Sequence, residues 1–241
     1  MSMKAVLYLA KEPGRGVMGD LESLKGHDVT IVACLPGYLE YYQVLGYNAI
    51  TADQFFTLTD MKFDVVIGNP PYGSGGNLAI KFINKAAELS DDVRMVLPVS
   101  VRKSSSINKI DPHIKCVTDE LLPDDTFPGQ IKAVYQHWVP TDTPRPKLET
   151  YKTHKDFEFV DQSVADCMIG RVGNGPTGKV KTEDFQGYKK DHYYIKATPE
   201  VIDNLKSISL ELVEISGAAA NGMRSLSKHE LIETYIKYYG A

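Results

Sequence analysis

The chain has 241 residues, of which 43% are hydrophobic and 24% are charged, and its formal net charge is -4. This length accommodates one large domain, or one domain joined to a smaller one. No apolar run approaches the roughly 20 residues that a membrane-spanning helix needs. The negative charge gives no overall sign of nucleic-acid binding, which would have to depend on a local basic patch.

The cysteines and histidines form no metal-binding pattern. Cys34, Cys116 and Cys167 lie far apart without a CxxC pair, so we expect no zinc site. An odd, scattered set of cysteines is typical of a reducing compartment. The first apolar run lacks the small-residue cleavage site of a signal peptide, and we interpret it as a strand. We therefore expect the chain in the cytoplasm.

The first hundred residues alternate between two kinds of pattern. Apolar spacing typical of helices occurs in 35–46, which stops at Gly46, and in 77–90. Short β-prone runs lie around these segments, at 5–10, 28–34, 48–53, 63–68 and 93–101. This alternation predicts an α/β fold with a doubly wound sheet. In such sheets, ligands bind beyond the carboxyl ends of the strands.

The pattern changes after about residue 104. A polar segment at 104–109 is expected to be a loop, and two β-rich runs flank the turn at 123–130. Three prolines in 140–147 indicate a linker. We therefore expect a catalytic domain of residues 1–140 and a smaller β-rich and helical region of residues 141–241. The last helix of that region should begin at Ser227, with Glu230 three residues later completing a capping box.

The stretch "FDVVIGNPPYGSGG" places Asn69-Pro70-Pro71-Tyr72 directly after a strand. Prolines fix φ and remove backbone donors, so this turn presents hydrogen-bond acceptors. The Asn69 carboxamide oxygen and the Pro70 carbonyl would draw the hydrogens of a planar amine and free its delocalised lone pair. The Tyr72 ring offers a stacking surface for a base flipped out of a duplex. The alternative is an ordinary turn at the end of a strand.

This tetrapeptide after a Phe-Asp-apolar strand resembles the catalytic motif of NPPY-type S-adenosylmethionine-dependent adenine-N6 DNA methyltransferases. The resemblance implies a class I, Rossmann-like methyltransferase fold with a mixed sheet. It also implies methyl transfer from S-adenosylmethionine to the N6 amine of a flipped-out adenine in double-stranded DNA. Asn69, Pro70, Pro71 and Tyr72 would be the catalytic residues. The resemblance further implies the cytoplasm of a bacterium or of a phage-infected host cell. Whether a restriction or specificity partner exists stays open.

The same resemblance implies a cofactor site at the ends of the first three strands. Glu12, Gly14 and Gly16 look like a shortened first motif, in which the acid meets the methionine amine and the glycines allow close approach. Asp53, with Gln54 beside it, resembles the acid that accepts a hydrogen bond from the adenine of the cofactor. Asn69 would also contact the cofactor.

Two features leave alternatives open on the cofactor side. Asp53 is also explained as a helix N-cap or turn residue. The second strand ends at Cys34, where the family carries an acid that binds the ribose hydroxyls. This departure puts the affinity for the cofactor in question.

Residues implied in substrate binding lie in both halves of the chain. Phe127 resembles the aromatic residue that packs against the flipped base from the other side, with a core or turn residue as the alternative. The region 141–241 would recognise the target, with Arg171, Lys179 and Lys181 on phosphates. An ordinary surface hairpin explains the three cations equally well.

Three functional hypotheses remain. The first is a DNA adenine-N6 methyltransferase. The second is an NPPY enzyme that acts on RNA adenine or on a protein glutamine. The third is a degenerate, non-catalytic DNA-binding subunit, which the shortened first motif and the absent ribose acid favour and the intact tetrapeptide opposes.

Overall fold

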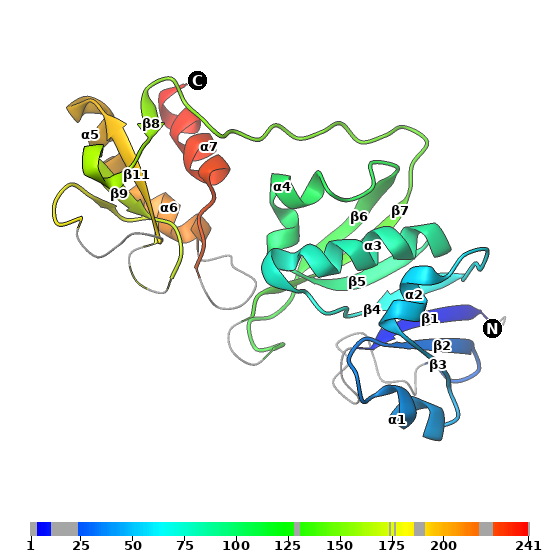
Figure 1. Cartoon of the computed structure of the whole chain (residues 1–241). Coiled ribbons are helices and arrows are strands. Elements are labelled where there is room, and N and C mark those ends of the chain that lie inside the picture. The colour runs from blue at the N-terminus through cyan, green and yellow to red at the C-terminus, as the bar shows by residue number, and fades with distance from the viewer. Residues whose placement is uncertain are drawn as a thin grey trace. The chain divides into compact units, whose positions relative to one another are not determined.

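The computed structural model describes residues 4–10, 24–127, 131–173, 175, 177–185, 191–216 and 224–240. The chain divides into two compact units, which we call unit 1 (Met1–Leu148) and unit 2 (Glu149–Ala241) (Figure 1). The division falls at the end of the proline-containing segment, not at residue 140. Glu12, Gly14 and Gly16 lie outside the described residues.

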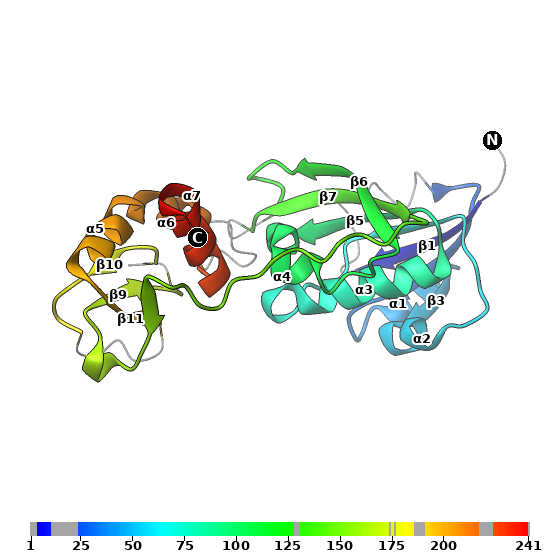
Figure 2. The ribbon, with the colours of Figure 1, turned by 90° about the horizontal axis from the view of Figure 1, so that it is seen from above.

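Unit 1 is built on a seven-stranded mixed sheet with the order β3-β2-β1-β4-β5-β7-β6 (Figure 2). Neighbouring strands from β3 through β5 are parallel, whereas β7 runs antiparallel to both β5 and β6. The predicted α/β fold with a doubly wound, mixed sheet is therefore confirmed. The strands are β1 (Ala5–Ala10), β2 (Asp28–Ala33), β3 (Asn48–Thr51), β4 (Val65–Gly68), β5 (Val93–Pro98), β6 (Ile114–Leu121) and β7 (Ala133–Pro140).

Helices cover this sheet on both faces. Tyr42 of α1 packs into a buried cluster with Tyr8 and Ile31 on one face. On the other face, Phe55 of α2 stacks on Phe82 of α3 with ring centroids 5.2 Å apart. The helices of unit 1 are α1 (Leu39–Val44), α2 (Ala52–Thr57), α3 (Asn77–Leu89) and α4 (Ser104–Ile107).

The structure agrees with the predicted end of the first helix. Gly46 follows α1 with a φ of 85°, as expected of a glycine that ends a helix. The segment 104–109 was expected to be a polar loop, and that expectation is wrong, because it contains α4. The amides of Ser106 and Ile107 both donate to the Lys103 carbonyl. Serine side chains compete for backbone hydrogen bonds and favour turns, so the three serines of this segment suggested a loop.

Unit 2 is a four-stranded antiparallel sheet with the order β10-β9-β11-β8, packed against three helices. Its buried core joins Cys167, Ile169 and Ile195 of the sheet to Leu205 and Leu231 of the helices. Helix α6 was not foreseen from the sequence. The elements are β8 (Phe157–Phe159), β9 (Cys167–Gly170), β10 (Val180–Lys181), β11 (His192–Ala197), α5 (Pro199–Ser207), α6 (Ser209–Ser216) and α7 (Lys228–Tyr239).

The start of α7 is fixed by the predicted capping box. The Glu230 amide donates to Ser227 Oγ at 3.2 Å, and the Ser227 amide donates to the Glu230 carboxylate at 2.7 Å. Two of the otherwise unpaired amides at the helix start are thereby satisfied. None of the helices in the described part of the chain has the length and apolar character needed to cross a membrane.

We expect Ser227→Ala to loosen the first turn of α7 by about 1 kcal/mol, because the substitution leaves the Glu230 amide unpaired. Hydrogen exchange measured on α7 peptides should then be about fivefold faster than in the wild type. Ser227→Asp is the matched control, because a carboxylate accepts the same bond. Equal exchange in wild type and Ser227→Ala would contradict this account of the helix start.

Candidate active site

The Asn-Pro-Pro-Tyr segment begins at the centre of the unit 1 sheet. Strand β4 lies between β1 and β5, and the chain order reverses between β1 and β4. The carboxyl ends of strands at such a reversal form the ligand-binding crevice of open α/β sheets. Asn69 follows Gly68 at this end, and its amide donates to the Leu9 carbonyl at 3.1 Å. The tetrapeptide therefore starts at the edge where a ligand is expected.

Gly68 is required by the close approach of β4 to β1. A Cβ at this position would lie 2.4 Å from the Leu9 carbonyl oxygen and 2.6 Å from Leu9 Cβ. The φ of 152° at Gly68 is also one that side chains rarely adopt. A larger residue would push the two strands apart and break the hydrogen bond that holds Asn69.

The glycine-rich segment after Tyr72 turns the chain back into α3. The Tyr72 carbonyl accepts from the amides of Leu78 at 3.1 Å and Ala79 at 3.3 Å. Gly73 has a φ of 68°, and a Cβ there would lie 2.7 Å from Leu78 Cβ. The tetrapeptide is thus held at both ends, by β1 before it and by the start of α3 after it.

Asn69 carries an acceptor that the described residues do not use. Its Oδ1 atom is buried and has no hydrogen-bond partner among them. An unpaired buried acceptor costs about 1–3 kcal/mol, which a donor from a ligand would remove. Tyr72 is half-buried, and burial raises the pKa of its hydroxyl above the ordinary value. Its side chain is therefore a neutral phenol at physiological pH, and it is neither a base nor an anion.

Sequence reasoning did not single out Ser100, which follows β5 at the same edge of the sheet. Its hydroxyl is buried and has no partner in the described part of the chain. A Cβ placed on Gly76 would lie 3.2 Å from this oxygen, so Ser100 sits against the loop that follows the tetrapeptide. A serine two residues beyond Pro98, the last residue of a buried strand, was the signal available in the sequence.

Asp53 and Gln54 lie in the first turn of α2, at the carboxyl end of β3. Thr51 is the N-cap: the Gln54 amide donates to Thr51 Oγ1 at 3.2 Å, and the Thr51 amide donates to Gln54 Oε1 at 2.8 Å. The capping role considered for Asp53 therefore belongs to Thr51. Gln54 Oε1 serves the helix, whereas the exposed Asp53 carboxylate lies at the edge where a ligand is expected.

Cys34 directly follows β2, at the position where the family pattern has an acid. Its thiol is buried and donates to the Val32 carbonyl at 3.5 Å. Burial raises the pKa of this thiol to about 12. The side chain therefore carries no negative charge at neutral pH and does not replace the ribose-binding carboxylate.

The residues expected on the substrate side fall in different units. Phe127 of unit 1 is half-buried in the connection between β6 and β7, which leaves the sheet at the same edge as Asn69. In unit 2, the Arg171 guanidinium lies 5.5 Å from the centroid of the Tyr193 ring. Lys179 and Lys181 are exposed, on and beside the short strand β10.

Unit 1 has the mixed α/β sheet with an antiparallel β7 that the class I, Rossmann-like methyltransferase fold predicts. Residues 40–109 match the family model described as Eco57I restriction-modification methylase. This segment contains Asp53, Gln54 and the whole tetrapeptide.

Solved structures give likenesses that cover somewhat more than half of the chain. A Thermoplasma acidophilum protein is 20% identical over 58% of this chain and 77% of its own, with a TM-score of 0.42. The 23S rRNA methyltransferase ErmE is 17% identical over 60% and 63%, with a TM-score of 0.40. The Pyrococcus abyssi tRNA (uracil-54, C5)-methyltransferase, solved with S-adenosyl-L-homocysteine, is 16% identical over 57% and 35%, with a TM-score of 0.39. No curated protein matches the chain.

The raised pKa of Cys34 predicts how the stability of unit 1 depends on pH. Below the ordinary thiol pKa of 9.0, Cys34 is protonated in both the folded and unfolded chain, so its contribution is constant. Between 9.0 and about 12 only the unfolded chain loses the proton, so the free energy of unfolding falls as pH rises. Cys34→Ala lacks this contribution and should have a shallower pH dependence above pH 9.

The measurement is urea unfolding at several alkaline pH values, followed by tryptophan fluorescence. Trp138, the only tryptophan of the chain, is buried in β7 and reports on unit 1 alone. The stability difference between wild type and Cys34→Ala should change by about 1.4 kcal/mol per pH unit in this window. Parallel curves for the two proteins would contradict the burial of a neutral thiol.

Proposed function

We propose that this chain transfers a methyl group from S-adenosylmethionine to the N6 amine of an adenine turned out of double-stranded DNA. The observation that carries the proposal is the buried, unpartnered oxygen of Asn69 at the reversal point of the sheet. The match to a restriction-modification methylase model over 40–109 favours DNA as the substrate.

The chemistry requires acceptors more than a strong base. The lone pair of an exocyclic amine is delocalised into the ring, which makes the nitrogen a poor nucleophile. Asn69 Oδ1 and the Pro70 carbonyl would each accept one N–H of the amine and draw the nitrogen toward tetrahedral geometry. Bound S-adenosylmethionine would supply an electrophilic methyl group on its sulfonium. Rate acceleration would then come from positioning and from preorganised acceptors.

The tetrapeptide would also hold the planar base. Pro70 is buried and Pro71 is half-buried. Because the proline ring fixes φ and the nitrogen carries no hydrogen, the two residues keep the turn rigid and offer no competing donors. Tyr72 would stack on the extruded adenine and offset part of the cost of removing it from the duplex. Phe127, from the connection beyond β6, would pack on the other side of the ring.

Two described residues would contact the cofactor. Asp53 is an exposed carboxylate that would accept a hydrogen bond from the adenine amine of S-adenosylmethionine, and Asn69 would lie beside the methyl group of the cofactor. Glu12, Gly14 and Gly16 would hold the methionine end. The neutral Cys34 leaves the ribose hydroxyls without the usual acid, so we expect weaker binding than in enzymes that have it.

Unit 2 would bring the target to the site. Arg171, Lys179 and Lys181 are candidates for phosphate contacts, which position a duplex without reading its sequence. A restriction or specificity partner belongs to the same proposal, because the matched family comes from restriction-modification systems.

The first test is calorimetric titration of the chain with S-adenosylmethionine, followed by transfer of labelled methyl to mixed-sequence DNA and RNA. Heat of binding and label in DNA adenine are expected. Label in RNA alone would replace the DNA substrate by RNA, and binding without transfer would point to another acceptor. No binding at all would favour the non-catalytic subunit.

Asn69→Ala should lower the rate of methyl transfer by at least about a hundredfold, the size of effect seen when a preorganised group is removed from a reaction centre. Affinity for S-adenosylmethionine should stay within a few-fold, because most cofactor contacts lie elsewhere. Asn77→Ala is the matched control: Asn77 is exposed eight positions later and bonds to Ser74 and Lys109. Full activity of Asn69→Ala would overturn the proposed mechanism.

Tyr72→Ala should weaken capture of the target base by about tenfold, because stacking on an aromatic ring is worth about 1–3 kcal/mol per base. Tyr72→Phe should keep most of the affinity, since the ring does the stacking. The fluorescence of 2-aminopurine at the target position reports extrusion of the base. A Phe variant as defective as the Ala variant would assign the effect to the hydroxyl instead.

A further inference from the structure

One face of the unit 2 sheet lies opposite the face that packs against the helices of the core, and we call it the open face. Residues that alternate with the buried core positions point to this side. The register joins Met168 to both Tyr194 and Lys181, and Glu158 to Lys196. On this face Met168 and Tyr194 are buried, whereas Lys181 and Lys196 are exposed.

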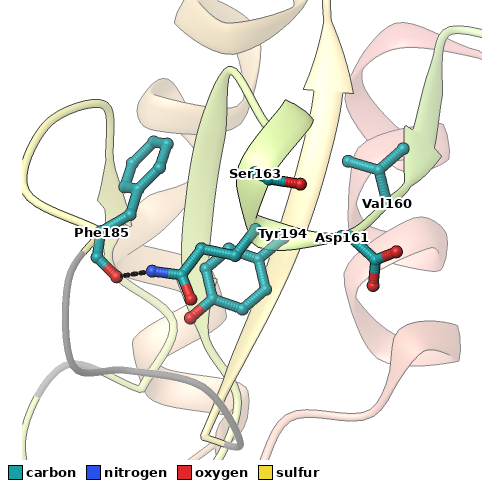
Figure 3. A pocket seen from close by; sticks show the side chains of 6 residues that line it. Val160, Asp161, Ser163, Phe185 and Tyr194 are labelled. Carbon is teal, nitrogen blue, oxygen red and sulfur yellow. Dashed lines mark hydrogen bonds between the residues drawn. The ribbon is translucent and has the colours of Figure 1, made fainter.

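A cavity of about 630 Å³ adjoins this face (Figure 3). Its wall combines two aromatic rings with polar side chains from the segment after β8. The Gln162 amide donates to the Phe185 carbonyl, which ties that segment to the strand-connecting loop opposite it. The centroids of the Phe185 and Tyr194 rings lie 6.4 Å apart. The lining residues are Val160, Asp161, Gln162, Ser163, Phe185 and Tyr194.

A second hollow of about 350 Å³ lies beside the first and shares Val160, Asp161 and Tyr194 with it. Its wall differs in charge, because it includes Lys228, whose ammonium lies 4.0 Å from the centroid of the Phe159 ring. Asp161 lines both hollows, and among the described lining residues only the smaller hollow adds a cation, Lys228.

This pairing matches the chemistry of a nucleotide. A planar base is recognised by aromatic contact and by hydrogen bonds to its edge, whereas a phosphate requires a cation or backbone amides. The Asp161 carboxylate would repel a phosphate and accept from an exocyclic amine. A base in the larger hollow would therefore place its phosphate in the smaller one, toward Lys228.

We propose that the cavity between Asp161, Phe185 and Tyr194 receives an unpaired base carrying an exocyclic amine, from the strand that the chain binds. This inference rests on the proposed function, since it takes nucleic acid as the partner. It adds a second base site, in unit 2, separate from the acceptor tetrapeptide of unit 1.

The test uses the full chain and fluorescence anisotropy with labelled single-stranded oligonucleotides of dA, dC or dT, and with duplex DNA. Phe185→Leu should weaken binding of the dA and dC strands about tenfold, the loss expected for one stacked base. Tyr238→Leu is the matched control, because Tyr238 is an exposed aromatic on α7. Tyr194→Leu should act like Phe185→Leu, and if this buried change prevents folding, the half-exposed Phe185 still decides the result.

Asp161→Asn tests the base edge. It should reduce the preference for dA and dC over dT severalfold without a uniform loss of affinity, because thymine has no exocyclic amine. Wild-type affinity in Phe185→Leu, or no binding of any strand by the wild type, would overturn the proposal. The proposal would also be overturned if the chain bound duplex DNA more tightly than single strands and Phe185→Leu bound both with wild-type affinity.

Failure of the proposed function gives a different result. Methyl transfer would then be absent in the wild type and in every variant, while the affinities for oligonucleotides would still separate Phe185→Leu from Tyr238→Leu. Transfer by the wild type with equal affinities for all variants would reject the base site and leave the methyltransferase proposal intact.

Discussion

The candidate active site depends on how closely β4 approaches β1. Gly68 leaves no room for a Cβ against the Leu9 carbonyl, and the next amide bonds to that same carbonyl. Because the first residue of the tetrapeptide is fixed in this way, its carboxamide is presented at the central reversal of the sheet. The carbonyl of Tyr72 then fixes the other end on the start of α3. A rigid frame of backbone hydrogen bonds thus surrounds the Asn69 oxygen, which has no partner among the described residues.

Two buried oxygens at this edge, those of Asn69 and Ser100, have no partner among the described residues. Folding desolvates such groups at a cost, so a purely structural role would favour apolar residues of the same shape. Native proteins keep unpaired polar groups mostly where function needs them. In unit 1 they lie on neighbouring strands at the edge where ligands bind, which agrees with a site that is completed by its substrate.

Much of the fold was readable from local patterns, and the failures have physical causes. The alternation of apolar strands and helices predicted the unit 1 sheet, and Ser227 with Glu230 predicted the start of α7. Helix α4 was missed because serine has weak intrinsic helix preference, and here tertiary context overrides it. Gln54 was assigned to the cofactor, although its side-chain oxygen also closes a capping box with Thr51 at the end of β3.

The candidate site residues likewise fall into those that a local sequence pattern predicts and those that depend on tertiary pairing. The sequence singled out Asn69 and Tyr72 as candidates, because a strand running into two prolines is a local signal with a clear chemical meaning. It did not reveal Ser100 or the open face of unit 2. Both depend on which strands become neighbours and on which side of the sheet each residue faces. A one-residue change of register would move each side chain to the opposite face of the sheet. Long-range pairing of this kind leaves little trace in a single sequence.

The contact between β1 and β4 also constrains the order in which the molecule assembles. Leu9 and Gly68 are separated in the chain by β2, α1, β3 and α2, so their pairing is a non-local event with a large loop-closure cost. The tetrapeptide acquires its shape only when this late step has occurred, although its residues are contiguous. During synthesis, the acceptor geometry would therefore be absent from a chain that had already emerged through residue 76 but had not yet closed its central strands.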